Sequence, residues 1–171
     1  MDSKLANIQL LLLDVDGVLT DGSITYSDSG EQIKTFNSRD GLGLRLLMES
    51  GIKVGIITGR SSKALGYRCA NLGISLLFEG VKDKSAALEK IILNTGIPVS
   101  HIAFVGDDLI DLPVMKKVGV SFCVADAPEE VKQHSRIVTI REGGHGAVRE
   151  ICESILKAKG FWGKIIDRYL S

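Results

Sequence analysis

Four short apolar segments recur along the chain, and patterns typical of helices separate them. The apolar segments span Ile8–Leu13, Val54–Ile57, His101–Val105 and Val120–Val124. Runs of this length, rich in Leu, Ile and Val, are typical of strands buried on both faces of a parallel sheet. Helices are expected at about 40–50, 61–72, 83–95, 109–117 and 146–158. The alternation predicts an α/β fold with a doubly wound parallel sheet, in one domain over residues 1–171.

One segment interrupts this alternation. Residues 23–26 and 32–36 form two stretches typical of strands, the first of which alternates polar and apolar side chains, and Ser27–Glu31 between them is rich in turn-forming residues. This pattern predicts a β-hairpin that projects after the first strand, within about 18–37. Its apolar side chains suit either an interface between subunits or the subunit's own core: Ile24, Tyr26, Ile33 and Phe36.

Charge and composition exclude several classes of protein. Lys and Arg number 21 and Asp and Glu also number 21, so the chain lacks the basic excess that nucleic-acid binding requires. The longest apolar run, Leu10–Leu13, is far shorter than the roughly 20 residues of a membrane span. Acidic residues follow that run directly, which argues against a signal peptide. The three cysteines are odd in number and widely spaced, which favours a reducing, cytoplasmic compartment.

Two aspartates follow the first apolar segment. Asp14 and Asp16 lie two positions apart, and Gly17 after them permits a sharp turn. In an extended chain this spacing points both carboxylates in the same direction. In open α/β sheets ligands bind at the carboxyl ends of the strands. Two carboxylates placed there repel each other unless a cation or a shared proton reduces the repulsion. The alternative interpretation is that Asp14 and Asp16 are solvated capping residues at the end of a strand.

A second acidic group follows the third apolar segment. Asp107, Asp108 and Asp111 come directly after the strand predicted to end near Val105. Carboxylates gathered from two neighbouring strand ends are the oxygen ligands that Mg²⁺ prefers. The pattern therefore predicts a magnesium site at this edge of the sheet.

Between these acidic groups lie residues suited to hold an anion. Thr58, Gly59 and Arg60 follow the second apolar segment, and a helix starting after Arg60 would direct backbone N–H groups towards the site. Lys82 and Lys84 open the next predicted helix and could neutralise a phosphate. Taken singly, Thr58 also suits a helix cap, and Lys84 a solvated lysine. Their order along the chain favours a phosphate site.

Together these motifs resemble the haloacid dehalogenase superfamily of phosphotransferases. The order D-x-D-G, T-G-R, K and G-D-D-x-x-D carries the resemblance from Ile8 to about Ala125. Within the superfamily the chain is similar to the 3-deoxy-D-manno-octulosonate (KDO) 8-phosphate phosphatases. The segments D-V-D-G-V-L-T-D-G, S-R-D-G and I-I-T-G-R and the hairpin carry that likeness, which Gly143–Glu150 extends to about residue 158.

The resemblance implies a role for each matched residue. Asp14 would be the nucleophile that forms an aspartyl-phosphate, and Asp16 the general acid and base. Asp14, the backbone carbonyl of Asp16 and Asp107 would hold Mg²⁺. Thr58 and Lys84 would bind the phosphoryl oxygens. Asp108 and Asp111 would orient Lys84 or a water on the metal.

The resemblance also implies how the sugar acid is recognised. The interval between Asp14 and Thr58 has no room for a large cap domain, so the site would be closed by assembly into a homotetramer whose hairpins join at the centre. Arginines suit planar anions, although Arg45 and Arg68 also suit a solvated helix face. The residues expected to bind substrate are Asp16, Asn37, Ser38, Arg39, Asp40, Gly41, Arg45, Arg60, Arg68 and Lys84.

Two features depart from the family pattern. His145 stands where the family often has arginine, and a lone histidine in a loop is more often a capping residue than a catalytic one. The amphipathic end, residues 160–171, contains Trp162 and does not match the family's short polar end, so its contacts stay open between a neighbour and its own sheet.

Three alternatives remain beside the expected KDO 8-phosphate phosphatase. The substrate could be a nine-carbon sialic-type acid 9-phosphate, because the catalytic residues do not distinguish the two sugars. Non-catalytic regulatory relatives exist, although Asp14 and Asp16 are both retained here. A phosphate-accepting receiver domain also uses acids at strand ends, but its nucleophile does not lie two residues before a second aspartate.

Overall fold

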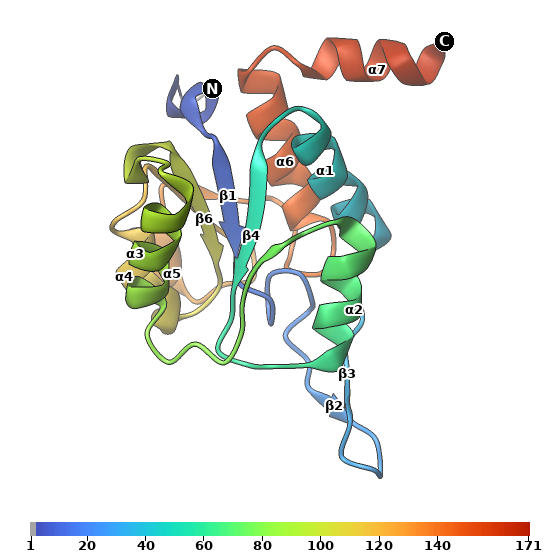
Figure 1. Cartoon of the computed structure of the whole chain (residues 1–171), viewed down its shortest axis with the longest axis vertical. Helices are drawn as coiled ribbons and strands as arrows, with labels where there is room; N and C mark the ends of the chain where they lie inside the picture. Colours follow the sequence, from blue (N-terminus) through green and yellow to red (C-terminus); the bar gives the residue numbers. More distant parts are fainter. Residues whose placement is uncertain (1–2) are drawn as a thin grey trace.

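Six parallel strands form the sheet at the centre of the protein. The computed structural model describes residues 3–171 and orders the strands β5-β4-β1-β6-β7-β8 (Figure 1). In chain order they are β1 (Leu10–Leu13), β4 (Lys53–Ile57), β5 (Leu76–Phe78), β6 (Ile102–Gly106), β7 (Val120–Cys123) and β8 (Ile137–Val138). The central strand β1 pairs in parallel with β4 and β6, so that Leu13 lies opposite Ile56 and Val105. The predicted α/β parallel sheet is confirmed.

Helices cover both faces of this sheet. On one face lie α1 (Ser38–Glu49), α2 (Lys63–Leu72) and α6 (Ala147–Ala158), and on the other α3 (Lys84–Thr95), α4 (Leu112–Met115) and α5 (Glu129–His134) (Figure 1). Three short 3₁₀ turns, η1 (Ser3–Asn7), η2 (Val99–His101) and η3 (Leu109–Asp111), and a last helix, α7 (Trp162–Leu170), complete the described chain. Within residues 3–171, every helix is too short or too polar to traverse a bilayer.

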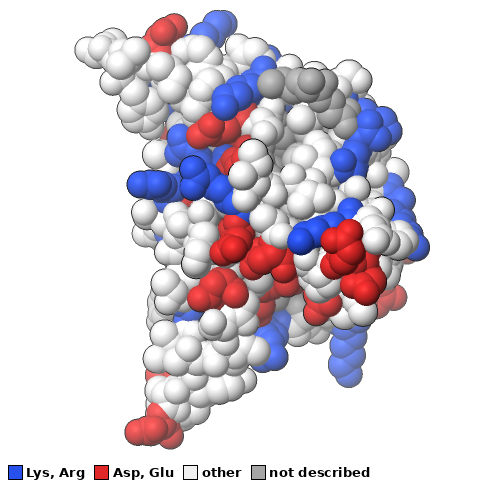
Figure 2. Space-filling model, turned by 180° about the vertical axis from the view of Figure 1, so that it is seen from behind, with Lys and Arg blue, Asp and Glu red and all other residues white. Residues whose placement is uncertain are grey.

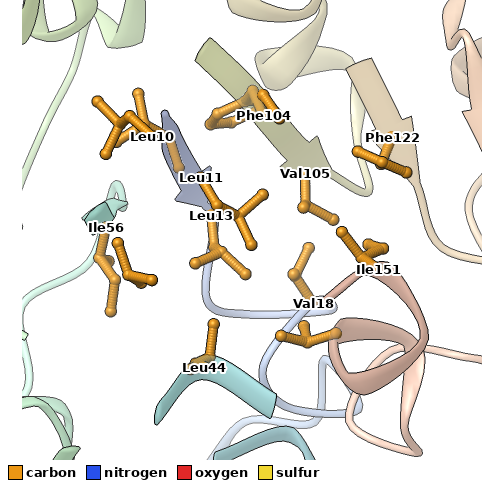
Figure 3. Packing of buried hydrophobic residues seen from close by; sticks show 14 of the residues in the cluster. Leu10, Leu11, Leu13, Val18, Leu44, Ile56, Phe104, Val105, Phe122 and Ile151 are labelled. Atoms are coloured by element: carbon orange, nitrogen blue, oxygen red, sulfur yellow. The ribbon is translucent and has the colours of Figure 1, made fainter. Parts of the chain in front are cut away.

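The core lies between the sheet and the two helical layers. All four residues of β1 are fully buried, and Figure 3 draws Leu10, Leu11 and Leu13 among buried side chains of the neighbouring strands and of α1 and α6. Each such side chain contributes about 1.5–3 kcal/mol by leaving water. Gly55 on β4 permits close packing, because a Cβ there would lie 2.6 Å from Leu76 and 2.8 Å from Leu12. This rigid centre fixes the strand ends that bear the acidic residues.

The predicted hairpin is present and projects from the carboxyl edge of the sheet. Its strands β2 (Thr25–Tyr26) and β3 (Gln32–Ile33) pair antiparallel. Of its four apolar side chains, Phe36 packs against the core, whereas Ile24, Tyr26 and Ile33 stay exposed. Figure 2 shows that most of this projection is uncharged and that acidic residues lie at its tip. Basic and acidic residues are mixed over the rest of the face shown.

The C-terminal helix α7 docks on its own subunit. Trp162 packs against the core, with the charged ends of Arg149 and Lys157 over its ring, and Ile165 is buried. Arg168 forms an ion pair of 2.8 Å with Glu49 at the end of α1. These contacts hold α7 against α6 and α1 at the amino-terminal edge of the sheet, opposite the edge from which the hairpin projects (Figure 1).

Candidate active site

The predicted acidic residues meet at the carboxyl edge of the sheet. Asp14 directly follows β1 and Asp107 directly follows β6, while Thr58 follows β4. These three strands are adjacent, and the Asp14 amide donates a hydrogen bond of 3.0 Å to the Val105 carbonyl. Residues more than ninety positions apart in the sequence are therefore held side by side by the sheet.

A buried ion-pair network joins the first and second acidic groups. The Lys84 ammonium lies 3.0 Å from an oxygen of Asp14 and 2.7 Å from Asp111, and all three side chains are buried. The other oxygen of Asp111 accepts the amide hydrogens of Asp107 and Asp108 at 3.0 and 3.3 Å. Buried charges are tolerated when they are paired and hydrogen-bonded in this way. The expected contact between Asp111 and Lys84 is thus present.

The network keeps Lys84 charged. Burial acts to lower the pKa of Lys84, but the carboxylates of Asp14 and Asp111 raise it, and the net pKa lies above its ordinary value. Asp83, just before it, caps α3 by accepting the amide hydrogen of Ala86 at 3.1 Å. The start of α3 therefore places a fixed positive charge beside Asp14.

Asp107 is the least satisfied carboxylate of the group. Its Oδ1 is buried without a hydrogen-bond partner, and burial, followed by the charges of Asp14, Asp111 and Asp108, raises its pKa to about 8. Burial and the charge of Asp111 raise the pKa of Asp14 to about 6 although Lys84 opposes them. Crowded carboxylates of this kind are relieved by a cation.

The acidic cluster suits a hard divalent cation. Asp14, Asp107 and Asp111 can each offer one oxygen, and these atoms lie within 4.8 Å of one another. Both oxygens of Asp111 already serve Lys84 and backbone amides, which leaves Asp14 and Asp107 with free lone pairs. Gly17 opens the space for Asp107, because a Cβ at Gly17 would lie 2.0 Å from Asp107 Oδ2. Carboxylate oxygens in this arrangement fit Mg²⁺.

The second motif aspartate faces a different cation. Asp16 forms an ion pair with Lys34, which follows β3 of the hairpin, and the Arg60 guanidinium lies 3.8 Å from its other oxygen. The Lys34 side chain is only 3% exposed. Lys34 was not predicted from the sequence. It lies two positions before Phe36, hence on the same side of an extended segment as that residue, which packs against the core.

Arg60 lines a cleft between the hairpin and α2, and Thr58 lies two residues before it in the chain. Thr58 is buried, and its hydroxyl accepts the amide hydrogen of Arg60 at 3.4 Å. The helix after Arg60 begins at Lys63, two residues later than predicted, because Ser62 caps it. The cleft has a volume of about 790 Å³, and Tyr26 and Tyr67 are among its lining residues.

Several of the expected substrate residues build the base of the hairpin. Asn37 caps α1 by accepting the amide hydrogen of Arg39 at 2.8 Å, and its own amide donates to the Gly144 carbonyl at 3.2 Å. Arg68 donates to the Asn37 carbonyl at 3.0 Å, and its guanidinium lies over the Phe36 ring. These contacts fix the point where the hairpin returns to the sheet.

A second cleft, of about 770 Å³, lies beside the start of α1. Ser38 and Arg39 line it together with His145 and Arg149. Arg149 is paired with Glu153 at 2.8 Å, so much of the positive charge there is balanced. His145 lies in the loop before α6, where its amide donates to the Glu142 carbonyl at 3.1 Å.

Three expected substrate residues lie in packed or distant positions. Asp40 is buried and accepts the amide hydrogen of Arg149 at 2.7 Å, which ties α1 to the start of α6. Gly41 gives room to Arg68, because a Cβ there would lie 2.3 Å from its guanidinium. Arg45 donates to the Asn71 carbonyl at 2.7 Å, near the end of α2 and away from the acidic cluster.

Comparison with known proteins places this geometry in a family. A sequence model of the haloacid dehalogenase-like hydrolases matches residues 74–151. The 3-deoxy-D-manno-octulosonate 8-phosphate phosphatase KdsC of Escherichia coli is 49% identical over 92% of this chain and 84% of its own length. The chain belongs to the KDO 8-phosphate phosphatase family. The resemblance read from the sequence motifs is confirmed.

Solved structures of this family share the fold. A KDO 8-phosphate phosphatase of Moraxella catarrhalis, in complex with magnesium, phosphate and KDO, has a TM-score of 0.95 and 43% identity over 97% of this chain and 95% of that chain. The cobalt-bound phosphatase of Haemophilus influenzae has a TM-score of 0.90 and 45% identity, covering 92% of each chain. The whole described architecture, including the hairpin, is therefore that of the family.

Proposed function

We propose that this protein hydrolyses KDO 8-phosphate to KDO and inorganic phosphate with the help of Mg²⁺. The observation that carries the proposal is the buried trio at the end of β1, in which Lys84 lies 3.0 Å from Asp14 and 2.7 Å from Asp111. It places a nucleophile beside a fixed cation that can hold a phosphoryl oxygen. The 49% identical phosphatase of E. coli supports the choice of substrate.

The reaction follows from the positions of the two motif aspartates. A carboxylate oxygen of Asp14 attacks phosphorus, the bond between phosphorus and the sugar oxygen breaks, and Asp16 gives its proton to that oxygen. Asp16 then accepts a proton from a water molecule, whose oxygen attacks the aspartyl-phosphate. The bond between phosphorus and Asp14 breaks, which restores the carboxylate and releases phosphate.

Positively charged and hydroxyl groups hold the phosphate during both steps. Lys84 and the buried Thr58 bind phosphoryl oxygens, and Asp111 keeps Lys84 in place. Asp14, Asp107 and the backbone carbonyl of Asp16 are the residues that would hold Mg²⁺. When bound, the cation neutralises charge so that an anionic nucleophile can approach an anionic ester.

The sugar has room in the cleft beside Arg60. This cleft of about 790 Å³ opens between the hairpin and α2, and Arg60 also lies 3.8 Å from Asp16. A guanidinium there suits the carboxylate of the sugar acid. Arg39 lines the second cleft, and Arg45 is hydrogen-bonded to the Asn71 carbonyl. Arg60 is therefore better placed than Arg39 or Arg45 to contact the sugar.

Assembly and location complete the proposal. The hairpin leaves Ile24, Tyr26 and Ile33 exposed, as expected if four copies join there in a homotetramer. The 171 residues would act as a single phosphatase domain in the cytoplasm, supported by three buried, unpaired cysteines that suit a reducing compartment.

Phosphate release from the purified protein tests the substrate. KDO 8-phosphate, a nine-carbon sialic-type acid 9-phosphate and hexose phosphates are each offered with Mg²⁺ and with EDTA. We expect metal-dependent turnover with a strong preference for KDO 8-phosphate. Preference for the nine-carbon ester would overturn the proposed substrate but keep the proposed reaction mechanism. No phosphate release from any ester would instead favour a non-catalytic relative.

Substitution of the nucleophile tests the chemistry. Asp14→Asn keeps the shape of the side chain and should abolish turnover while the fold and the oligomeric state persist. Asp167→Asn, at an exposed position on α7, is the matched control and should keep wild-type activity. Retained activity in Asp14→Asn would show that Asp14 does not form a covalent intermediate.

A further inference from the structure

The hairpin contributes a buried cation that the motif residues do not account for. Lys34 lies just beyond β3, its side chain is 3% exposed, and its ammonium contacts Asp16. A buried ammonium is costly unless a carboxylate pairs with it, so this position demands a partner. The contact joins the hairpin to the residue that exchanges protons in the proposed reaction.

Arg60 cannot hold Asp16 as firmly. Its Nε lies 3.8 Å from the other oxygen of Asp16, and its side chain is 47% exposed. An exposed ion pair at this distance is screened by water and does little to fix the orientation of the carboxyl group. Lys34 is therefore the group that fixes the direction of the Asp16 carboxyl.

We propose that Lys34 is a positioning residue for the general acid and base. This role rests on the proposed function. Lys34 holds the Asp16 carboxyl towards the oxygen that leaves phosphorus. Proton transfer requires the donor to lie within hydrogen-bond reach of that oxygen, so a freed Asp16 would transfer its proton less often. The hairpin thereby takes part in the chemistry of its own subunit.

Esters that differ in their need for a proton test this role. The alkoxide of KDO 8-phosphate leaves with a proton, whereas the nitrophenolate of 4-nitrophenyl phosphate leaves without one. Lys34→Met should lower kcat/KM for KDO 8-phosphate by roughly 10- to 100-fold, which is no more than the 10²–10⁴-fold that general acid catalysis supplies, because Asp16 itself is retained. The loss for 4-nitrophenyl phosphate should stay below about threefold, because that step does not use the proton.

Conservative and matched variants separate positioning from folding. Lys34→Arg should restore most of the activity on KDO 8-phosphate, because it keeps a cation beside Asp16. Lys117→Met removes another paired lysine, 3.1 Å from Glu89, and should leave both esters unaffected. If Lys34→Met fails to fold, Lys34→Gln replaces it, since it keeps a hydrogen-bond donor.

A double-mutant comparison shows whether Lys34 acts through Asp16. In an Asp16→Asn background, adding Lys34→Met should change kcat/KM by less than about threefold. An additive loss there, an equal loss on both esters, or no loss on either would each overturn the proposal. A wild type that hydrolyses 4-nitrophenyl phosphate but not KDO 8-phosphate overturns the proposed substrate instead, and the Lys34 comparison then uses an alkyl phosphate that it does hydrolyse.

Discussion

Magnesium binding should tighten as the pH rises from 7 to 9. Asp107, which would bind the cation, is buried among Asp14, Asp111 and Asp108, and its pKa is raised to about 8. A carboxyl must lose its proton before it binds a metal ion. Because the raised pKa keeps the proton on Asp107 at neutral pH, protons compete with the cation until the pH exceeds about 8.

The size of the effect follows from this pKa. With a pKa of about 8, Asp107 is roughly nine-tenths protonated at pH 7 and about one-tenth protonated at pH 9. The apparent Kd should therefore fall by about tenfold between these pH values. Below pH 6 the carboxyl of Asp14, with a pKa of about 6, also holds its proton and the dependence should steepen.

Isothermal titration calorimetry of the metal-free protein with MgCl₂ measures both consequences. Titrations in buffers with different ionisation enthalpies should show about one proton released per ion at pH 7 and about a tenth of a proton at pH 9. Asp107→Asn is the control and should abolish the tight binding. An affinity that is the same at pH 7 and pH 9, without proton release, would show that Asp107 is already ionised at neutral pH or does not bind the cation.

Three further predictions concern packing and stability. Gly17→Ala should lose magnesium binding and magnesium-dependent activity, because the new Cβ would lie 2.0 Å from Asp107 Oδ2 and the backbone φ of +85° at this position disfavours alanine. Titration calorimetry measures the binding, and phosphate release measures the activity. In EDTA the melting temperature should fall as the pH rises from 5 to 9, because the raised pKa values of Asp14 and Asp107 make the folded state bind more protons than the unfolded state. Trp162→Ala should lower the free energy of unfolding, measured by urea unfolding, by about 1–3 kcal/mol and leave kcat unchanged. The loss is smaller than for truncating a fully buried aromatic side chain, because Trp162 is only partly buried.

Each of these three has an outcome that contradicts it. Wild-type magnesium affinity in Gly17→Ala would show that the loop after β1 can move away from Asp107. A melting temperature in EDTA that rises with pH would mean that the acidic cluster is already ionised near pH 5. A fall in kcat in Trp162→Ala would place α7 near the active site of some subunit.

The centre of the fold was predictable because its strands are buried on both faces. The four apolar segments correspond to β1, β4, β6 and β7, with ends shifted by at most two residues. The outer strands β5 and β8 are only partly buried and short, and the sequence shows them weakly. Residues 74–82 left room for β5, whereas β8 and the six-residue α5 were not predicted.

The positions of the residues proposed to be catalytic were predictable, because the ends of adjacent strands bring them together whatever conformation the loops adopt. Residues that depend on helix rotation were harder to place, since periodicity alone does not say which way Arg45 faces or that Asp40 caps α6. Lys34 was missed because a lysine in a short hairpin strand is usually solvated. Only the packing of Phe36 shows that this side of the hairpin faces inwards.

The two ends of the described chain lie far from the chemistry. Both η1 and α7 are placed at the amino-terminal edge of the sheet, and the acidic cluster and hairpin are at the carboxyl edge (Figure 1). A surface linker, reporter protein or second enzyme attached after α7 would extend away from the substrate entrance. The sheet thus acts as a spacer between such a tether and the acidic cluster of the same subunit.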